Sequence, residues 1–201
     1  MPAKAQRMAS GPRHKILCVD DDQQVLEGLS LQLGRRYEVL TALSGSQALE
    51  ILRIEAGIPR YGQDLAEDTL PLEAGILNAL SFNKGCYIGQ EIVERARSRG
   101  HVNWKLMGLR LEQGAPVPKP GEVLTVDGKT IGEVTSACFS PSLGRPVALA
   151  YVRREVSEPR TRLVLTTGSG AEVVQLPFFL NDGSREAGSA TGDTVEQALH
   201  P

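Results

Sequence analysis

The chain has 201 residues, which is enough for one medium-sized domain or two small ones. Hydrophobic residues make up 41% of it and charged residues 23%, both ordinary values for a soluble globular protein. No apolar run approaches the roughly 18 residues that a transmembrane helix needs. The formal net charge of −2 gives no general attraction to nucleic acid or anionic lipid, so we expect no membrane partner and no direct nucleic-acid binding.

The cysteines and the N-terminus both favour a cytoplasmic protein. Cys18, Cys86 and Cys138 are an odd, widely spaced set without a CxxC pair, which argues against a disulfide framework and a closed zinc site. A reducing compartment fits this usage, with any special thiol acting alone. Residues 1–13 are polar, lack the apolar core of a secretory signal, and are expected to form a disordered leader.

Residues 14–52 show the alternation of a parallel α/β segment. Their first strand is a short apolar run that stops abruptly at three acids, as expected for a buried strand with polar groups at its carboxyl end. The order strand, helix, strand, helix predicts the start of a parallel sheet. The predicted elements are strands at residues 14–19 and 37–40 and helices at residues 25–33 and 46–52.

The alternation of strand and helix signals ends at residue 52, and residues 53–104 show a different pattern. A Gly/Pro-punctuated turn region begins at Arg53 and runs to Gly62, and Glu73–Leu80 is expected to be a short helix or an extended segment. The stretch KGCYIGQE at Lys84–Glu91 then leads into a predicted helix over residues 92–97, whose last turn is basic as the helix dipole favours.

From residue 105 the pattern is that of short strands separated by turns. Asp127-Gly128 is a strong signal for a type I′ hairpin turn. Five or six such strands over residues 105–180 predict a small antiparallel β-barrel, and residues 181–201 have the composition of a disordered tail. The fold class is therefore α+β. The strands are predicted at residues 106–111, 123–126, 130–135, 147–152, 161–165 and 171–178.

The segment at residues 14–52 resembles the first two βα units of a response-regulator receiver domain, with ILCVDDD at residues 16–22 as the main match. The resemblance implies that Asp20 and Asp21 would help to hold Mg²⁺ beside a phospho-accepting aspartate. The third strand that should carry this aspartate does not follow, so we expect neither bound Mg²⁺ nor phosphorelay activity. The alternative is that Asp20–Asp22 are solvated loop acids or a cap of the first helix.

The stretch RIEAGIP at residues 53–59, followed by Tyr61-Gly62, resembles the R-x-E-x-G-x-P…Y-G motif of the T-protein (aminomethyltransferase) superfamily. In that superfamily the glutamate accepts hydrogen bonds from the pterin ring of tetrahydrofolate, which gives this role to Glu55. The alternative is that Glu55 pairs with Arg53 or Arg60 on the surface.

KGCYIGQE resembles the K-G-C-Y-x-G-Q-E motif that distinguishes YgfZ-type folate-binding proteins within the same superfamily, and the resemblance covers residues 52 to about 178. It makes Cys86 the candidate functional thiol, whose pKa a nearby lysine and helix N-terminus would lower. A buried inert cysteine is the alternative. The folate region would also include Lys84, Tyr87, Gln90 and Arg95.

YgfZ-type proteins bind folate and assist the assembly or repair of iron–sulfur enzymes, with links to tRNA modification. The resemblance therefore implies tetrahydrofolate as cofactor and iron–sulfur proteins as partners. The family's folate pocket also uses an N-terminal half that the chain replaces with the receiver-like segment, so we expect an incomplete pocket and doubtful enzyme activity. Three alternatives remain: a receiver-derived signalling adaptor, aminomethyl transfer, and a fused or truncated product without function.

Overall fold

The structure, a computed structural model, describes residues 13–81, 89, 91 and 102–181. The chain divides into two compact units, Met1–Glu50 and Ile51–Pro201, which we call the N-terminal unit and the barrel unit. Within the described residues, no helix is both long enough and apolar enough to cross a membrane.

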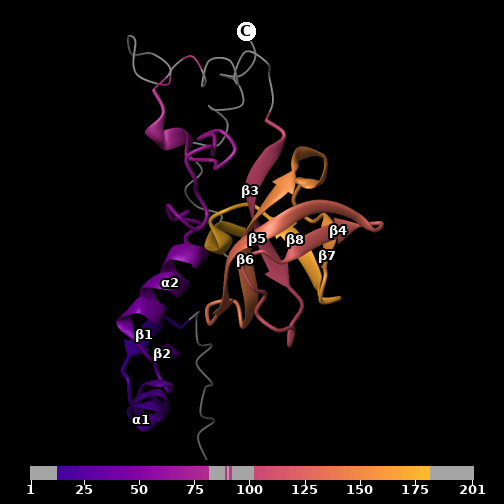
Figure 1. The fold of residues 1–201 in the computed structure, drawn as a ribbon. Helices are drawn as coiled ribbons and strands as arrows, with labels where there is room; N and C mark the ends of the chain where they lie inside the picture. The colour runs from indigo at the N-terminus through magenta and orange to yellow at the C-terminus, as the bar shows by residue number, and fades with distance from the viewer. Residues whose placement is uncertain (1–12, 82–88, 90, 92–101, 182–201) are drawn as a thin grey trace, which may run out of the picture. The chain divides into compact units, whose positions relative to one another are not determined.

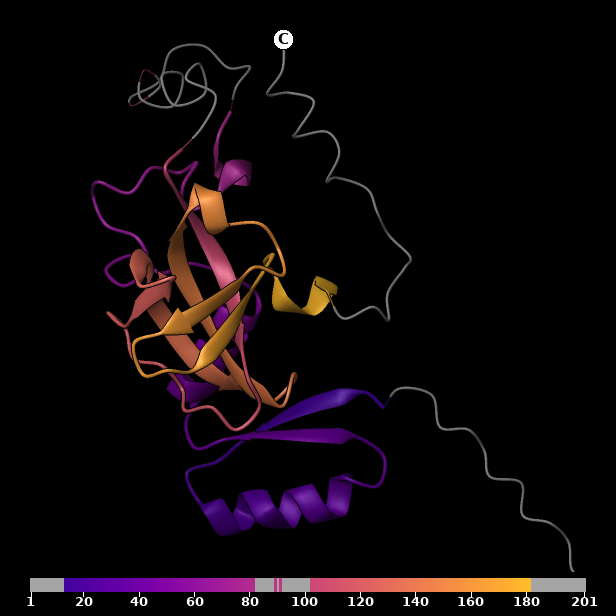
Figure 2. The same ribbon diagram turned by 90° about the vertical axis from the view of Figure 1, so that its right-hand side faces the viewer.

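The N-terminal unit contains a two-stranded parallel sheet. The strands β1 and β2 pair from Lys15↔Glu38 to Val19↔Ala42, and α1 lies along the pair (Figure 2). This confirms the predicted parallel start. The elements are β1 (Lys15–Val19), α1 (Gln23–Leu33), β2 (Glu38–Ala42) and the beginning of α2 (Gly45–Glu55).

The helix α2 runs three residues further than the sequence pattern predicted, because its end is a well-formed Schellman cap. The Ile58 N–H donates to the Arg53 carbonyl at 3.0 Å, and the Gly57 N–H donates to the Ile54 carbonyl at 2.9 Å. Gly57 has φ +67°, the left-handed conformation that glycine adopts without strain. The expected turn region therefore begins at the cap rather than at Arg53.

Residues 59–81 follow α2 and form a loop region with little regular secondary structure. A bridge joins Tyr61 to Leu65, and a single 3₁₀ turn, η1, covers Leu77–Ala79. This turn lies within Glu73–Leu80, where a short helix or an extended segment was predicted.

The barrel unit contains six antiparallel strands in the closed order β3-β6-β5-β4-β7-β8 (Figure 1), which confirms the predicted barrel. Asp127 and Gly128, at the β4–β5 turn, have φ values of +50° and +75°, as a type I′ turn requires. The strands are β3 (Trp104–Leu111), β4 (Val123–Val126), β5 (Lys129–Ser140), β6 (Arg145–Arg153), β7 (Arg162–Leu165) and β8 (Gly170–Val174).

The largest differences from the predicted strand boundaries are at the ends of β5 and β8. β5 continues to Ser140, five residues beyond the predicted end, since it pairs with β6 along its whole second half. β8 ends at Val174, and Phe178 belongs to the 3₁₀ turn η3 (Phe178–Asn181). A further 3₁₀ turn, η2, covers Arg154–Val156.

Apolar residues form two clusters in the barrel unit. The first draws buried side chains from all six strands and fills the barrel interior. The second covers the outer face of three strands, where Ile54 from α2 and Phe178 from η3 pack on them. The second cluster holds the end of α2 against the barrel. Its buried members are Ile54, Leu106, Val147, Leu149, Val174 and Phe178.

Candidate functional site

The last turn of α2 lies along the outer face of β5, where alternate residues point to the same side. Arg53 and Glu55 each bond to a serine of this face, and Ile54 belongs to the outer cluster against which Cys138 packs. The three consecutive residues of the R-x-E motif therefore all face the barrel. The serines are Ser136 and Ser140, two residues either side of Cys138.

Asp64 is the centre of a buried polar network and is 2% exposed. Its Oδ2 accepts from the Arg53 Nη1 at 2.6 Å and from the Arg60 N–H at 2.9 Å. Its Oδ1 accepts from the Thr135 hydroxyl at 2.5 Å and the Ser136 hydroxyl at 2.6 Å. Four donors thus converge on one carboxylate and join the end of α2, the following loop and β5.

A β-bulge in β5 makes this convergence possible. Adjacent residues of a regular strand point to opposite faces, so two neighbours could not both reach Asp64. The β5–β6 register shifts between Val134 and Ser136, which leaves Thr135 as an extra residue. Such a bulge redirects side chains locally, and here it brings the Thr135 and Ser136 hydroxyls to the same acceptor.

Glu55 is buried, with 8% exposure, so it does not lie on the surface as the alternative interpretation had it. Its Oε1 accepts from the Ser140 hydroxyl at 2.5 Å and weakly from the Ser142 N–H at 3.4 Å. Its Oε2 accepts from the Ser142 hydroxyl at 2.9 Å. A carboxylate offers about four lone-pair positions, so roughly one remains open, on Oε2.

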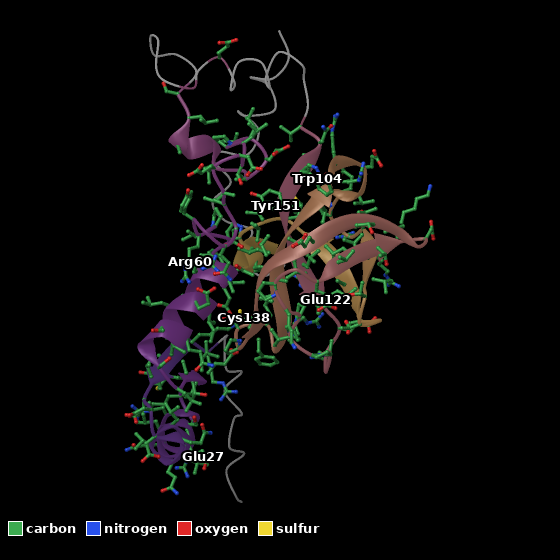
Figure 3. All side chains as sticks on the ribbon, viewed as in Figure 1. Glu27, Arg60, Trp104, Glu122, Cys138 and Tyr151 are labelled. Carbon is green, nitrogen blue, oxygen red and sulfur yellow. The ribbon has the colours of Figure 1, made fainter. Side chains whose placement is uncertain are left out.

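A cleft of 670 Å³ lies beside this network, between the loop after α2 and strands β3 to β6, and Asp64 and Thr135 are among its lining residues. Trp104 of β3 and Tyr151 of β6 belong to its wall (Figure 3). Burial raises the pKa of Tyr151 to about 12, with the charges of Asp64 and Glu73 adding to the rise and the Thr69 side chain opposing it. The phenol therefore stays protonated at neutral pH.

The remaining sequence-predicted residues of the folate region, and the candidate thiol, lie outside the described residues. Of the KGCYIGQE stretch, only Gly89, with φ +87°, and the exposed Glu91 are described. The roles predicted for the other residues stay predictions. They are Lys84, Cys86, Tyr87, Gln90 and Arg95.

The acids after β1 form local backbone contacts. The Asp20 Oδ1 accepts from the Asp22 N–H at 2.9 Å, and Asp22 caps α1 by accepting from the Gln24 N–H at 2.8 Å. Asp21 is exposed. Among the residues that the structure describes, no group of three or more metal-binding side chains gathers, here or elsewhere. The magnesium role of Asp20 and Asp21 has no support from this geometry.

Sequence reasoning missed Asp64, Ser136 and Ser140. Asp64 lies two residues after the Tyr61-Gly62 part of the superfamily motif. Its closeness to the motif could have marked it as a candidate site residue. The serines gave no signal, because the bulge that aims Ser136 and the length of β5 that places Ser140 arise from strand pairing.

Comparison with known proteins agrees with this architecture. Residues 105–179 match the family model of the glycine cleavage T-protein C-terminal barrel domain. The barrel is thus similar to the T-protein barrel domain. The crystal structure of glycine cleavage system aminomethyltransferase T from Bartonella henselae is similar over 78% of this chain and 43% of that one, with 29% identity and a TM-score of 0.62.

Two curated aminomethyltransferases are also similar. The Rubrobacter xylanophilus protein is 38% identical over 159 residues, which are 79% of this chain and 42% of the relative. The Halalkalibacterium halodurans protein is 34% identical over 168 residues, 82% of this chain and 45% of the relative. The chain thus spans less than half the length of these relatives, and the comparisons support the T-protein superfamily for its C-terminal part.

These alignments also include residues before 52. Residues 52–201 make up about three-quarters of the chain. Alignments over 79% and 82% of the chain must therefore extend into residues 14–51. Part of the segment for which a receiver domain was predicted is consequently similar to aminomethyltransferases.

Proposed function

We propose that this chain is a YgfZ-type folate-binding accessory protein that supports the assembly or repair of iron–sulfur enzymes in a reducing cytoplasm, with a link to tRNA modification. The observation that carries this proposal is KGCYIGQE at Lys84–Glu91, directly before a T-protein barrel at residues 105–179. The iron–sulfur role rests on the motif, and the folate role rests on both features.

Glu55 fits a pterin ligand only in part. Its open lone-pair position on Oε2 suits one N–H donor of an aminopyrimidine edge. A second donor on the same edge needs the Ser142 hydroxyl to release Oε2. In this proposal Glu55 orients the pterin by accepting an N–H bond, and Ser140 holds the carboxylate in place.

The glutamate tail of a folate is anionic and does not suit the cleft at Tyr151, whose described walls carry acids and no basic side chain. The basic residues near the signature, Lys84 and Arg95, are the better partners for that tail. The proposed folate region therefore combines Glu55 with the signature and excludes the cleft.

Isothermal titration of the 201-residue chain with 5-formyltetrahydrofolate tests the folate role. We expect weak binding, with a Kd of about 0.1 mM, since a ligand usually needs most of its surface buried. Glu55→Gln should weaken binding about tenfold, whereas Ser142→Ala should tighten it, because Oε2 then accepts a second donor. Glu158→Gln, at an exposed site, is the matched control. Absence of heat at millimolar ligand, or equal losses in Glu55→Gln and Glu158→Gln, would refute the role.

Complementation tests the accessory role. In cells without their own YgfZ-type protein, the chain should restore the activity of an iron–sulfur enzyme, and Cys86→Ser should abolish the rescue. Full rescue by Cys86→Ser would remove the thiol from the proposed function. Failure of the wild-type chain to rescue, while its stable expression is verified, would count against the accessory role itself.

Aminomethyl transfer is the second candidate, favoured by the activity in the names of the two curated relatives. An assay with aminomethylated lipoyl carrier protein and tetrahydrofolate separates the two, and the accessory role predicts no turnover. A receiver-derived adaptor makes a different prediction, namely that Mg²⁺ with beryllofluoride shifts the amide signals of Asp20 and Asp21. A product without function would pass none of these tests.

A further inference from the structure

The edge of β1 that faces away from β2 has no strand beside it among the described residues (Figure 2). In a parallel pair, alternate residues of a strand bond to the neighbouring strand, and the residues between them point to the opposite edge. The His14 carbonyl accepts from the Glu38 N–H at 3.0 Å, and the Asp20 N–H donates to a β2 carbonyl at 3.2 Å. The even-numbered residues therefore bond to β2, and Leu17 and Val19 direct their N–H and C=O groups to the open edge.

The sheet behind this edge is small and incompletely covered. Val19 is 45% exposed, and Leu17 and Cys18 are half-buried. A two-stranded sheet is marginal by itself, and three or more strands with an apolar face are needed for independent stability. A strand added beside β1 would therefore satisfy open backbone groups and enlarge the apolar face at the same time.

The charges at the two ends of β1 indicate which strand fits beside it. Arg13 and Lys15 lie at its N-terminal end, and three acids, Asp20–Asp22, follow its C-terminal end. Arg13 and Asp21 are both exposed. A second copy of β1 in antiparallel orientation would bring each basic end beside an acidic end, whereas a parallel copy would place like charges together. The strand is thus complementary to itself in the antiparallel orientation.

The outer edge of β2 lacks this complementarity. Arg35 and Arg36 come shortly before β2, and Leu43 and Ser44 follow it, so antiparallel copies of β2 would bring no acid to the arginines. Pairing β1 of one copy with β2 of another would use two different surfaces, and such a contact continues into a ring or an open filament. The β1 edge is therefore the one that fits a closed, symmetric dimer with matched charges.

We propose that β1 pairs antiparallel with β1 of a second copy of this chain, which gives a symmetric dimer with a four-stranded sheet in the order β2-β1-β1-β2. The whole strand Lys15–Val19 overlaps when its central residue, Leu17, lies opposite Leu17 of the second copy. Leu17 then exchanges two backbone hydrogen bonds with its counterpart. The same register brings Arg13 beside Asp21 of the second copy, twice in each dimer. This inference is independent of the proposed folate and iron–sulfur roles.

Sedimentation equilibrium of the 201-residue chain tests the dimer. We expect a monomer–dimer equilibrium with a Kd of about 50 μM. Asp21→Lys turns both attractions across the dimer into repulsions and should raise the Kd at least about tenfold. Glu27→Lys, at an exposed site on α1 with the same change in charge, is the matched control and should leave the Kd unchanged. Arg13→Glu combined with Asp21→Lys exchanges the two charges and should restore most of the affinity.

A nuclear Overhauser measurement between copies tests the register. Ile16 lies opposite Cys18 of the second copy in the proposed register, as a pair without hydrogen bonds, whose Cα atoms are about 4.5 Å apart. A mixture of isotope-labelled and unlabelled chains should therefore show a contact between the Ile16 Hα of one copy and the Cys18 Hα of the other.

Several results would overturn the proposal. One is a chain that stays monomeric at about 0.5 mM, ten times the expected Kd. Equal effects of Asp21→Lys and Glu27→Lys would show that the copies associate by general charge or through another surface. An exchanged-charge variant that regains no affinity, while hydrogen exchange shows its N-terminal unit folded, would exclude the matched ends. Protected Leu17 and Val19 amides in a monomeric chain would assign the edge to another segment of the same chain.

Discussion

The barrel unit and the N-terminal unit differ in whether their sheets have open edges. The six strands of the barrel close on themselves, so each strand is paired on both sides. The parallel β1–β2 pair has no third strand among the described residues, and each strand keeps one unpaired edge. Isolated two-stranded sheets are marginal in water, and open edges invite pairing with other chains. Closure thus gives the barrel unit a self-sufficient fold that the N-terminal unit lacks.

The apolar core of the barrel unit is also larger than that of the N-terminal unit. Twelve buried residues fill the barrel interior. Among residues 13–50, the buried apolar residues are Leu26, Ala42 and Ala48, while Leu31 is 81% exposed and Leu49 is 67% exposed. Because burial of apolar area is the main favourable term in folding, stability should be concentrated in the barrel unit. Trp104, the only tryptophan, reports on that unit by its fluorescence.

The largest expected effect comes from Asp64→Ala in the barrel unit. The substitution leaves the guanidinium of Arg53 buried without its carboxylate, which typically costs about 3–5 kcal/mol. Urea denaturation followed by Trp104 fluorescence measures the loss. Asp68→Ala, at an exposed acid close in sequence, should change the free energy of unfolding by less than about 0.5 kcal/mol. Similar values for both variants would contradict the importance of the network.

Leu26→Ala tests the weaker unit. Leu26 is 1% exposed, and removing a buried leucine side chain costs about 3 kcal/mol, which is enough to unfold a small unit. Hydrogen exchange should lose its protection at α1, β1 and β2, while the Trp104 unfolding transition stays in place. Leu31→Ala, at an exposed position on the same helix, should leave both measurements unchanged. A shift of the Trp104 transition would show that the two units unfold together.

Gly57→Ala should destabilise the barrel unit by about 2–3 kcal/mol, since alanine is strained at positive φ and its Cβ would also clash. An ideal Cβ at Gly57 lies 2.7 Å from the Leu176 Cβ. Gly62 shares the conformation, with φ +82°, but has open space around it. Gly62→Ala should therefore cost only the backbone strain, about 1–2 kcal/mol. Equal unfolding free energies for the two variants would exclude the clash.

The smallest effect concerns pH. The pKa of Tyr151 rises from 10.0 to about 12 on folding. Between these values the unfolded chain loses the phenolic proton and the native one keeps it, so the stability contributed by the neutral phenol falls as pH rises through this range. It is fully present below pH 10. The wild-type chain should lose more stability than Tyr151→Phe between pH 9.5 and 11 in urea titrations followed by Trp104. Parallel curves would contradict the shift.

The barrel could be predicted from the sequence because strand periodicity and turn signals are local. Asp127-Gly128 specifies its hairpin by backbone preference alone. The polar networks could not be predicted in the same way. Glu55 was identified from a motif, but its bonds to Ser140 and Ser142 join residues far apart in the chain. These bonds depend on the position of the end of α2 against β5. That position is set by the packing of Ile54 in the outer cluster, which the sequence pattern does not show.

The extra residue at Thr135 has a consequence for how this strand can change during evolution. Val134 pairs with Ala150 of the barrel interior, and Ser136 pairs with Leu149 of the outer cluster. Deleting Thr135 would therefore leave a regular ladder in which Ser136 and Ser140 still lie on the outer face, and only the Thr135 donor to Asp64 would be lost. An insertion or deletion at a regular position of β5 would instead turn every following side chain to the opposite face, so the bulge marks the one place where this strand should tolerate a change in its length.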